Sequence, residues 1–169
     1  MPYSHSVYKK EVFEHFLMFV ARNSKILDGG AGCGTYSKLL KEHFPNMDGL
    51  EIHEPYSRMF NLKELYDNLF ITDIRDFDIS QYDYIILGDI IEHLSVPDAQ
   101  ALLNKIKEAD QLCMVAVPYN FHQGEEYGNV HETHLQPDLT EEIFLQRYPM
   151  MKLLFGNQFY GYFINYEYN

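Results

Sequence analysis

The sequence lacks any long apolar run and is short of basic residues. No stretch approaches the roughly 18 apolar residues that span a bilayer, and residues 1–16 hold no continuous apolar signal segment. We therefore expect a cytoplasmic protein without membrane contact. Acidic residues outnumber basic ones 25 to 13, giving a formal charge of -12. Such a surface repels phosphate over most of its area, which argues against nucleic acid as a partner.

Cysteine is also scarce. The two cysteines, Cys33 and Cys113, lie in glycine-rich or apolar surroundings without the spacing of a disulfide framework, so we expect buried thiols. The chain has 169 residues, about the length of one ordinary domain, and 46% of them are apolar. We therefore predict a single domain, residues 1–169, with a core that needs no disulfide or metal.

Strand-like and helix-like segments alternate along the chain after an amphipathic helix between Tyr8 and Val20. We predict strands at residues 25–28, 47–52, 68–74, 82–90 and 112–117, and helices at residues 35–44, 55–67, 97–109 and 140–148. Two strand-like runs flank Gly156 and Asn157 near the end. This order predicts an α/β fold, a doubly wound, mostly parallel seven-stranded sheet with helices on both faces and a C-terminal antiparallel hairpin.

Glycines are concentrated in "ILDGGAGCGTYS", residues 26–37, between the first strand and the following helix. A nicotinamide fingerprint requires G-x-G-x-x-G, and Thr35 stands where its third glycine belongs. What remains is an acid followed by alternate glycines: Asp28, Gly30, Gly32 and Gly34. Glycines let a ligand approach the backbone, and the carboxylate suits an ammonium or sulfonium group better than a pyrophosphate. A merely structural tight turn is the alternative.

In this motif, and over nearly the whole chain, the sequence resembles the class I S-adenosylmethionine-dependent methyltransferases. The resemblance implies that S-adenosyl-L-methionine binds at the glycines. It further implies that Glu51 accepts hydrogen bonds from the ribose hydroxyls, that Asp73 accepts one from the adenine amino group, and that Asp89 lies near the methionine end. Ile52 and Ile74, beside two of these acids, are expected to pack on the adenine faces.

The resemblance also places two segments, "DIIEHL" at 89–94 and "NVHETH" at 129–134, in the acceptor pocket. If the acceptor is a hydroxyl or a protonated amine, a base must remove a proton, and His93 and His134 are the catalytic candidates. Such a base would titrate near the ordinary histidine pKa of about 6.5.

A metal site is the alternative use of these segments. Quinone-precursor O-methyltransferases and small-RNA end methyltransferases carry a similar acid-x-x-Glu-His segment, which holds a divalent metal together with a later histidine. By this resemblance Asp89, Glu92, His93 and a loop histidine are candidate ligands. We prefer the general base, because Asp89 has a competing role near the cofactor and is one methylene shorter than the family's glutamate. Residues that only shape the pocket are a third interpretation.

The absence of one motif limits the class of methyl acceptor. The methyltransferases that act on the amino groups of DNA and glutamine have Asn/Asp-Pro-Pro-Tyr/Phe after the fourth strand, where this sequence has "GDII". Residues 118–139 form the longest irregular stretch and are expected to make the substrate lid. We therefore predict methyl transfer to an oxygen or nitrogen of a small-molecule acceptor. The alternatives are a non-catalytic S-adenosylmethionine-binding or partner subunit of the same fold and a different nucleotide-dependent enzyme.

The C-terminal run "FYGYFINYEY" alternates aromatic residues on both sides of a strand. A sheet covered by its own helices buries one such face, so we expect the other to allow a homodimer.

Overall fold

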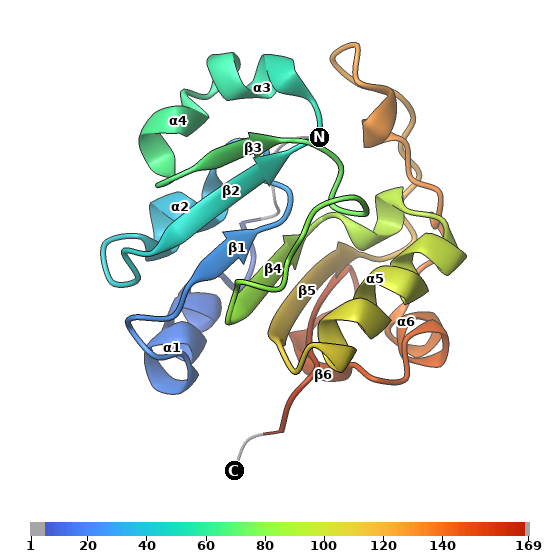
Figure 1. Cartoon of the computed structure of the whole chain (residues 1–169). Coiled ribbons are helices and arrows are strands. Elements are labelled where there is room, and N and C mark those ends of the chain that lie inside the picture. Colours follow the sequence, from blue (N-terminus) through green and yellow to red (C-terminus); the bar gives the residue numbers. More distant parts are fainter. Residues whose placement is uncertain (1–5, 168–169) are drawn as a thin grey trace. The chain divides into compact units, whose positions relative to one another are not determined.

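The computed structural model describes residues 6–167 and divides into two compact units, Met1–Tyr84 and Ile85–Asn169 (Figure 1). The prediction that residues 1–169 form a single domain stays a prediction.

The first unit alternates strands and helices. Its strands β1 and β2 are parallel, with Asp28 opposite Gly49, and β2 and β3 are parallel, with Glu51 opposite Ile71. Helix α1 packs beside α2 and buries Val12 and Phe16. The elements are α1 (Lys9–Phe19), β1 (Ile26–Asp28), α2 (Thr35–Leu40), β2 (Met47–Glu51), α3 (Glu54–Met59), α4 (Leu62–Leu65) and β3 (Leu69–Ile71).

The single helix predicted for residues 55–67 is wrong. The chain instead forms two short helices, α3 and α4, which are separated at Asn61. Asn61 has a φ of 51°, in the left-handed region that a continuous α-helix does not contain. Asparagine tolerates this conformation better than most residues, so the sequence permits the break without requiring it.

The second unit begins within a strand and ends with a hairpin. Helix α5 is capped by Ser95, which accepts from the N–H of Asp98 at 3.2 Å, and α6 by Thr140, which accepts from the N–H of Ile143 at 3.1 Å. The elements are β4 (Tyr84–Gly88), 3-10 helix η1 (Ile91–His93), α5 (Val96–Glu108), β5 (Leu112–Pro118), 3-10 helix η2 (Val130–Glu132), α6 (Glu141–Arg147), β6 (Lys152–Gly156) and β7 (Tyr160–Ile164).

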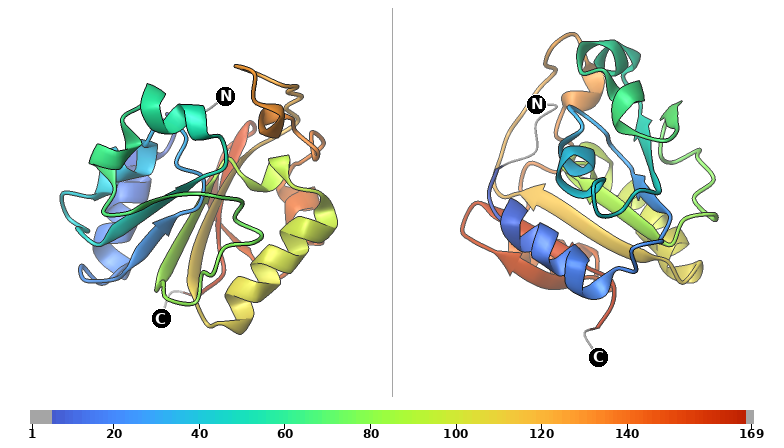
Figure 2. Two further views of the ribbon diagram at one scale, coloured as in Figure 1. Left: turned by 45° about the horizontal axis from the view of Figure 1, so that its top comes forward. Right: turned by 90° about the vertical axis from the view of Figure 1, so that its left-hand side faces the viewer.

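The strands follow the order β3-β2-β1-β4-β5-β7-β6 in a seven-stranded sheet. Strand β7 pairs antiparallel with both β5 and β6. The predicted fold class, with its C-terminal hairpin, is therefore confirmed. The long segment between β5 and α6, orange in Figure 2, carries η2.

Strand β7 differs from the sequence-based expectation in its burial. All five residues, Tyr160–Ile164, are buried, because β7 lies between β5 and β6 and is covered on both faces. The expectation that one aromatic face of this strand stays exposed is wrong. The homodimer that rested on it stays a prediction.

Two smaller expectations concern cysteines and membranes. Cys33 and Cys113 are free and buried, as predicted. Within residues 6–167, no helix combines the length and apolar character needed to cross a bilayer.

Candidate functional site

The glycine turn, residues 29–34, connects β1 to α2 in the first unit and contains Gly30, Gly32 and Gly34. Gly32 has a φ of 49° and Gly34 a φ of 77°, so both adopt the left-handed conformation that glycine reaches without steric cost. A Cβ atom at Gly34 would overlap Cδ1 of Leu65. The sequence therefore needs glycine here for backbone shape, and at Gly34 also for space.

Asp28 ends β1 and is fully buried. Its Oδ2 accepts a hydrogen bond from the hydroxyl of Tyr66 at 2.6 Å, whereas Oδ1 has no hydrogen-bond partner within the described part of the chain. Burial raises the pKa of the Asp28 carboxyl to about 7, and the Tyr66 hydrogen bond opposes that rise. The turn thus begins at a carboxyl group with an unused oxygen.

Glu51 ends β2, and the structure brings it directly to the glycine turn. Its Oε2 accepts from the N–H of Gly32 at 2.9 Å, and its Oε1 accepts from the N–H of His53 at 2.8 Å. The residue is only 5% exposed. Each carboxylate oxygen has a second lone pair, so Glu51 can stabilise the turn and still accept from a ligand.

Asp73 follows β3 by two residues and is paired with Arg75. The Nε of Arg75 lies 3.0 Å from both carboxylate oxygens, and Nη2 lies 2.5 Å from Oδ2. Ile74 is buried, and Ile52, after β2, is half-buried. Because Glu51 and Ile71 are register partners, these residues leave neighbouring strands at the same edge. Asp73 therefore lies just beyond the strand that it was expected to end, and it forms a salt bridge that sequence reasoning missed.

Asp89 belongs to the second unit, where it follows β4 with a φ of 56°. Its N–H donates to the carbonyl of Ala116 at 2.9 Å, and its Oδ1 accepts from the hydroxyl of Tyr160 at 2.6 Å. The polar contact from β7 thus fixes this carboxylate.

Glu92, His93 and His134, here called the histidine cluster, lie together in the second unit. One potential ligand atom from each lies within 4.8 Å of the others, and the two imidazole centroids are 4.7 Å apart. Glu92 is 1% exposed, and neither of its carboxyl oxygens has a hydrogen-bond partner in residues 6–167. Burial, reinforced by the charge of Asp89, raises the pKa of Glu92 well above its usual range.

The two histidines are held in a defined tautomer. The Nδ1 of His93 lies 3.2 Å from the carbonyl of Thr133, and the Nδ1 of His134 lies 2.8 Å from the carbonyl of Phe121. A carbonyl only accepts, so Nδ1 carries the hydrogen in both rings and Nε2 keeps its lone pair. His131, the other histidine of the loop, is exposed and stands outside the cluster.

The expected titration near 6.5 is wrong for His93. Burial, followed by the neighbouring His134, lowers the pKa of His93 to about 4. Burial also lowers the pKa of His134. Both rings are therefore neutral at neutral pH. Sequence spacing reveals neighbouring histidines but not how far they are removed from water.

The buried carboxyl of Asp28 gives a testable pH dependence. A raised pKa means that the folded chain holds a proton that the unfolded chain has lost, so stability falls as the pH rises from about 4 to about 7. The free energy of unfolding of the parent should decline over this window more steeply than that of Asp28→Asn. Replacing Tyr66 with phenylalanine should move the Asp28 pKa upward, measured by carbon NMR of the carboxyl. Identical slopes in parent and Asp28→Asn would contradict the assignment.

No protein-family model matches the sequence, and comparison with curated proteins finds no match. Solved structures do match. The chain is similar to 1,6-didemethyltoxoflavin-N1-methyltransferase of Burkholderia thailandensis, solved with 1,6-didemethyltoxoflavin and S-adenosylhomocysteine. The TM-score is 0.63 at 13% identity, over 94% of this chain and 76% of that one. An S-adenosylmethionine-dependent methyltransferase from Clostridium acetobutylicum gives a TM-score of 0.68 at 12% identity, over 93% of this chain and 89% of that one.

A third similar structure is the mitomycin 7-O-methyltransferase, with a TM-score of 0.60 at 14% identity, over 94% of this chain and 54% of that one. The chain thus spans about half the length of that enzyme. At these identities the likeness shows the fold, which is the class I methyltransferase fold.

Proposed function

We propose that this protein is an S-adenosylmethionine-dependent methyltransferase that transfers a methyl group to an oxygen or nitrogen of a small-molecule acceptor. The observation that carries the proposal is the hydrogen bond from Gly32 to Glu51, which joins the glycine turn to the acidic end of β2. A ligand at this turn can contact both the glycine backbone, which it can approach closely, and the carboxylate of Glu51. The similar proteins named after toxoflavin and mitomycin act on small molecules, which supports the acceptor class.

The first unit fits S-adenosyl-L-methionine in its buried groups. Asp28 offers an oxygen without a protein partner and would face the cationic methionine end. Gly30, Gly32 and Gly34 would let the ligand approach the backbone, and Glu51 would accept from the ribose hydroxyls.

The remaining cofactor contacts are proposed at the ends of β3 and β4. Asp73, held by Arg75, would accept from the adenine amino group, while Ile52 and Ile74 would pack on the ring faces. Asp89 would lie at the methionine end, held by its own hydrogen bond to β7.

When bound, S-adenosyl-L-methionine supplies a methyl group on a sulfonium sulfur and is left as S-adenosylhomocysteine. The chain's own task is to hold the reactants in line, to exclude water and to accept the acceptor's proton. Glu92, His93 and His134 are the proposed catalytic groups, because they lie close together. Within residues 6–167 the buried Glu92 carboxyl has no hydrogen-bond partner, and both imidazole rings hold their Nδ1 against a carbonyl.

For this cluster we now favour a divalent metal ion over a lone histidine base. A histidine whose pKa is about 4 is a weak proton acceptor at neutral pH. A cation would compensate the buried Glu92 carboxylate, and one carboxylate oxygen with two neutral imidazole nitrogens is a ligand set that zinc, manganese or magnesium accepts. Asp89 lies outside this group of ligand atoms. Such an ion would polarise an acceptor oxygen.

The non-catalytic alternative is separated from the enzyme by one measurement. A binding subunit would take up S-adenosylmethionine without forming S-adenosylhomocysteine in the presence of any acceptor tested. The cytoplasmic location and the homodimer stay predictions.

Replacing Gly32 with valine tests the cofactor site. A β-branched residue is strained at a φ of 49°, and a shift of the backbone there would disturb the N–H that Glu51 accepts from. Calorimetry should show S-adenosylhomocysteine binding weakened by about tenfold or more. Gly128→Val is the matched control, since Gly128 has a φ of 70° but open space around it. Unchanged affinity for S-adenosylhomocysteine in a folded Gly32→Val variant would contradict the assignment of the glycine turn as the cofactor site.

A further inference from the structure

The histidine cluster depends on a short 3-10 helix, η1, which carries Glu92 and His93. So short a helix has few hydrogen bonds of its own. Its carbonyl groups instead accept from the segment that follows His134. The N–H groups of Leu135 and Gln136 both donate to the carbonyl of Glu92, at 2.8 and 3.0 Å. The two parts of the cluster are therefore tied through backbone directly beside the reactive side chains.

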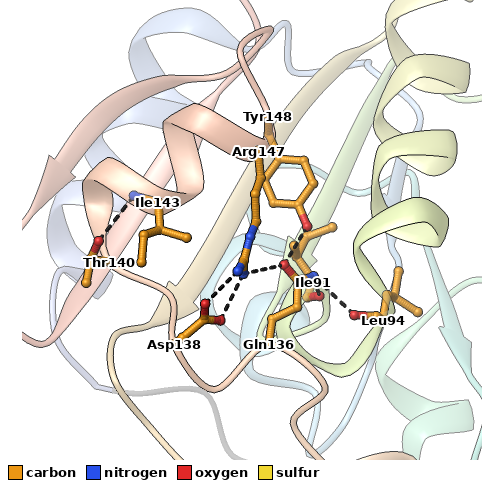
Figure 3. Close-up of polar contacts among 8 residues, drawn as sticks. All are labelled: Ile91, Leu94, Gln136, Asp138, Thr140, Ile143, Arg147 and Tyr148. Atoms are coloured by element: carbon orange, nitrogen blue, oxygen red, sulfur yellow. Dashed lines mark hydrogen bonds and ion pairs between the residues drawn. The ribbon is translucent and has the colours of Figure 1, made fainter.

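The side chain of Gln136 extends this connection (Figure 3). Its Nε2 donates to the carbonyl of Ile91 at 2.9 Å and to that of Leu94 at 3.1 Å. Its Oε1 accepts from the hydroxyl of Tyr148 at 2.8 Å and from Nη1 of Arg147 at 3.2 Å. Gln136 is 2% exposed, and these four bonds use both amide hydrogens and both oxygen lone pairs.

The far side of this amide is itself held firmly. Arg147 pairs with both oxygens of Asp138, at 2.9 and 2.5 Å, and its carbonyl accepts from Nε2 of Gln100 at 3.0 Å. The end of α6 therefore orients the Gln136 oxygen, and the orientation of the oxygen directs the NH₂ group at η1. Rotating the amide would place an oxygen against two carbonyls and an NH₂ group against two donors.

We propose that Gln136 is a positioning residue that sets the placement of Glu92 and His93 against His134 through the carbonyls of Ile91, in η1, and of Leu94, directly after it. The proposal rests on the histidine cluster being the catalytic centre. Polar groups that orient metal or catalytic side chains change affinity or activity by about 10- to 100-fold when they are removed.

Gln136→Leu keeps the approximate side-chain size but removes both amide hydrogen bonds, to Ile91 in η1 and to Leu94 directly after it. We expect the nuclear Overhauser contact between the His93 and His134 rings to weaken or disappear in the folded variant, because η1 loses its fixed orientation. Cobalt(II) alone, followed by its absorption bands, should bind about tenfold or more weakly than to the parent.

Two further variants distinguish positioning from ordinary stability. Tyr148→Phe removes one bond to the Gln136 oxygen but leaves the bonds from Gln136 to Ile91 and Leu94, and Gln100→Leu removes a part-buried amide bond that does not reach η1. Both should lower the unfolding temperature while keeping the ring contact and the cobalt affinity. A Gln136→Leu protein with the parent's ring contact would overturn the proposal. If the parent itself binds no cobalt, the metal site fails, and the ring contact still decides the role of Gln136.

Discussion

Replacing His134 with alanine is expected to lower methyl transfer by about 100-fold or more, whereas His131→Ala stays close to the parent rate. His134 is a member of the histidine cluster, and the carbonyl of Phe121 holds its Nδ1 at 2.8 Å. His131 lies in the same loop but is exposed and outside the cluster. A positioned catalytic group contributes about 10²- to 10⁴-fold to the rate. Comparing the two variants therefore distinguishes a catalytic role of His134 from a general effect of changing the loop.

The measurement is the S-adenosylhomocysteine formed with a panel of small phenols and amines, with and without a chelator. If the cluster holds an ion, chelation should abolish turnover, and magnesium, manganese or zinc should restore it. If His93 instead accepts the proton alone, the rate should survive the chelator, rise through about pH 4 and stay level above it. Equal losses in His134→Ala and His131→Ala would contradict the site itself.

Replacing Glu51 with glutamine is expected to weaken S-adenosylhomocysteine binding by about tenfold or more. The carboxylate accepts from the N–H groups of Gly32 and His53, and an amide would turn an NH₂ group toward one of these donors. Charge-assisted hydrogen bonds are each worth about 1.5–3 kcal/mol, and the proposed ribose contact would be lost with them. Stability should fall as well, because the residue is buried.

A second buried carboxylate on β2 controls for that loss of stability. Asp48 accepts from the N–H and Nδ2 of Asn68, at 3.0 and 2.9 Å, and from the hydroxyl of Tyr82 at 2.9 Å. Asp48→Asn should lower the unfolding temperature and leave the affinity for S-adenosylhomocysteine unchanged, as measured by calorimetry. If Glu51→Gln binds as the parent does, Glu51 serves only to support the glycine turn.

The sequence predicts those features that depend on local pattern. The alternation of strands and helices, the start of α6 near Thr140 and the hairpin around Gly156 and Asn157 follow from periodicity and turn residues, whereas the order of the strands in the sheet does not. The break at Asn61 does not, since the left-handed conformation there depends on how α3 and α4 pack.

In the candidate site, too, the sequence predicts some features, and others depend on how the chain packs. Acids at strand ends are visible in the sequence, and the contact between Glu51 and Gly32 agrees with that reading. The tyrosines that hold two of the acids, Tyr66 on Asp28 and Tyr160 on Asp89, are not visible, because 14 tyrosines give no signal of which one reaches which carboxyl. The lowered histidine pKa values depend on burial, which only the folded chain supplies.

The place of β7 between β5 and β6 has a consequence for synthesis on the ribosome. A nascent chain that has reached residue 159 already contains β5 and β6, but the strand that joins them has not yet been translated. Until Tyr160–Ile164 leave the exit tunnel, the edge of β5 that pairs with β7 stays unpaired. Strand β6, which joins the sheet only through β7, has no strand to pair with. Tyr160 arrives in the same stretch, so the hydroxyl that fixes Asp89 is added only together with β7.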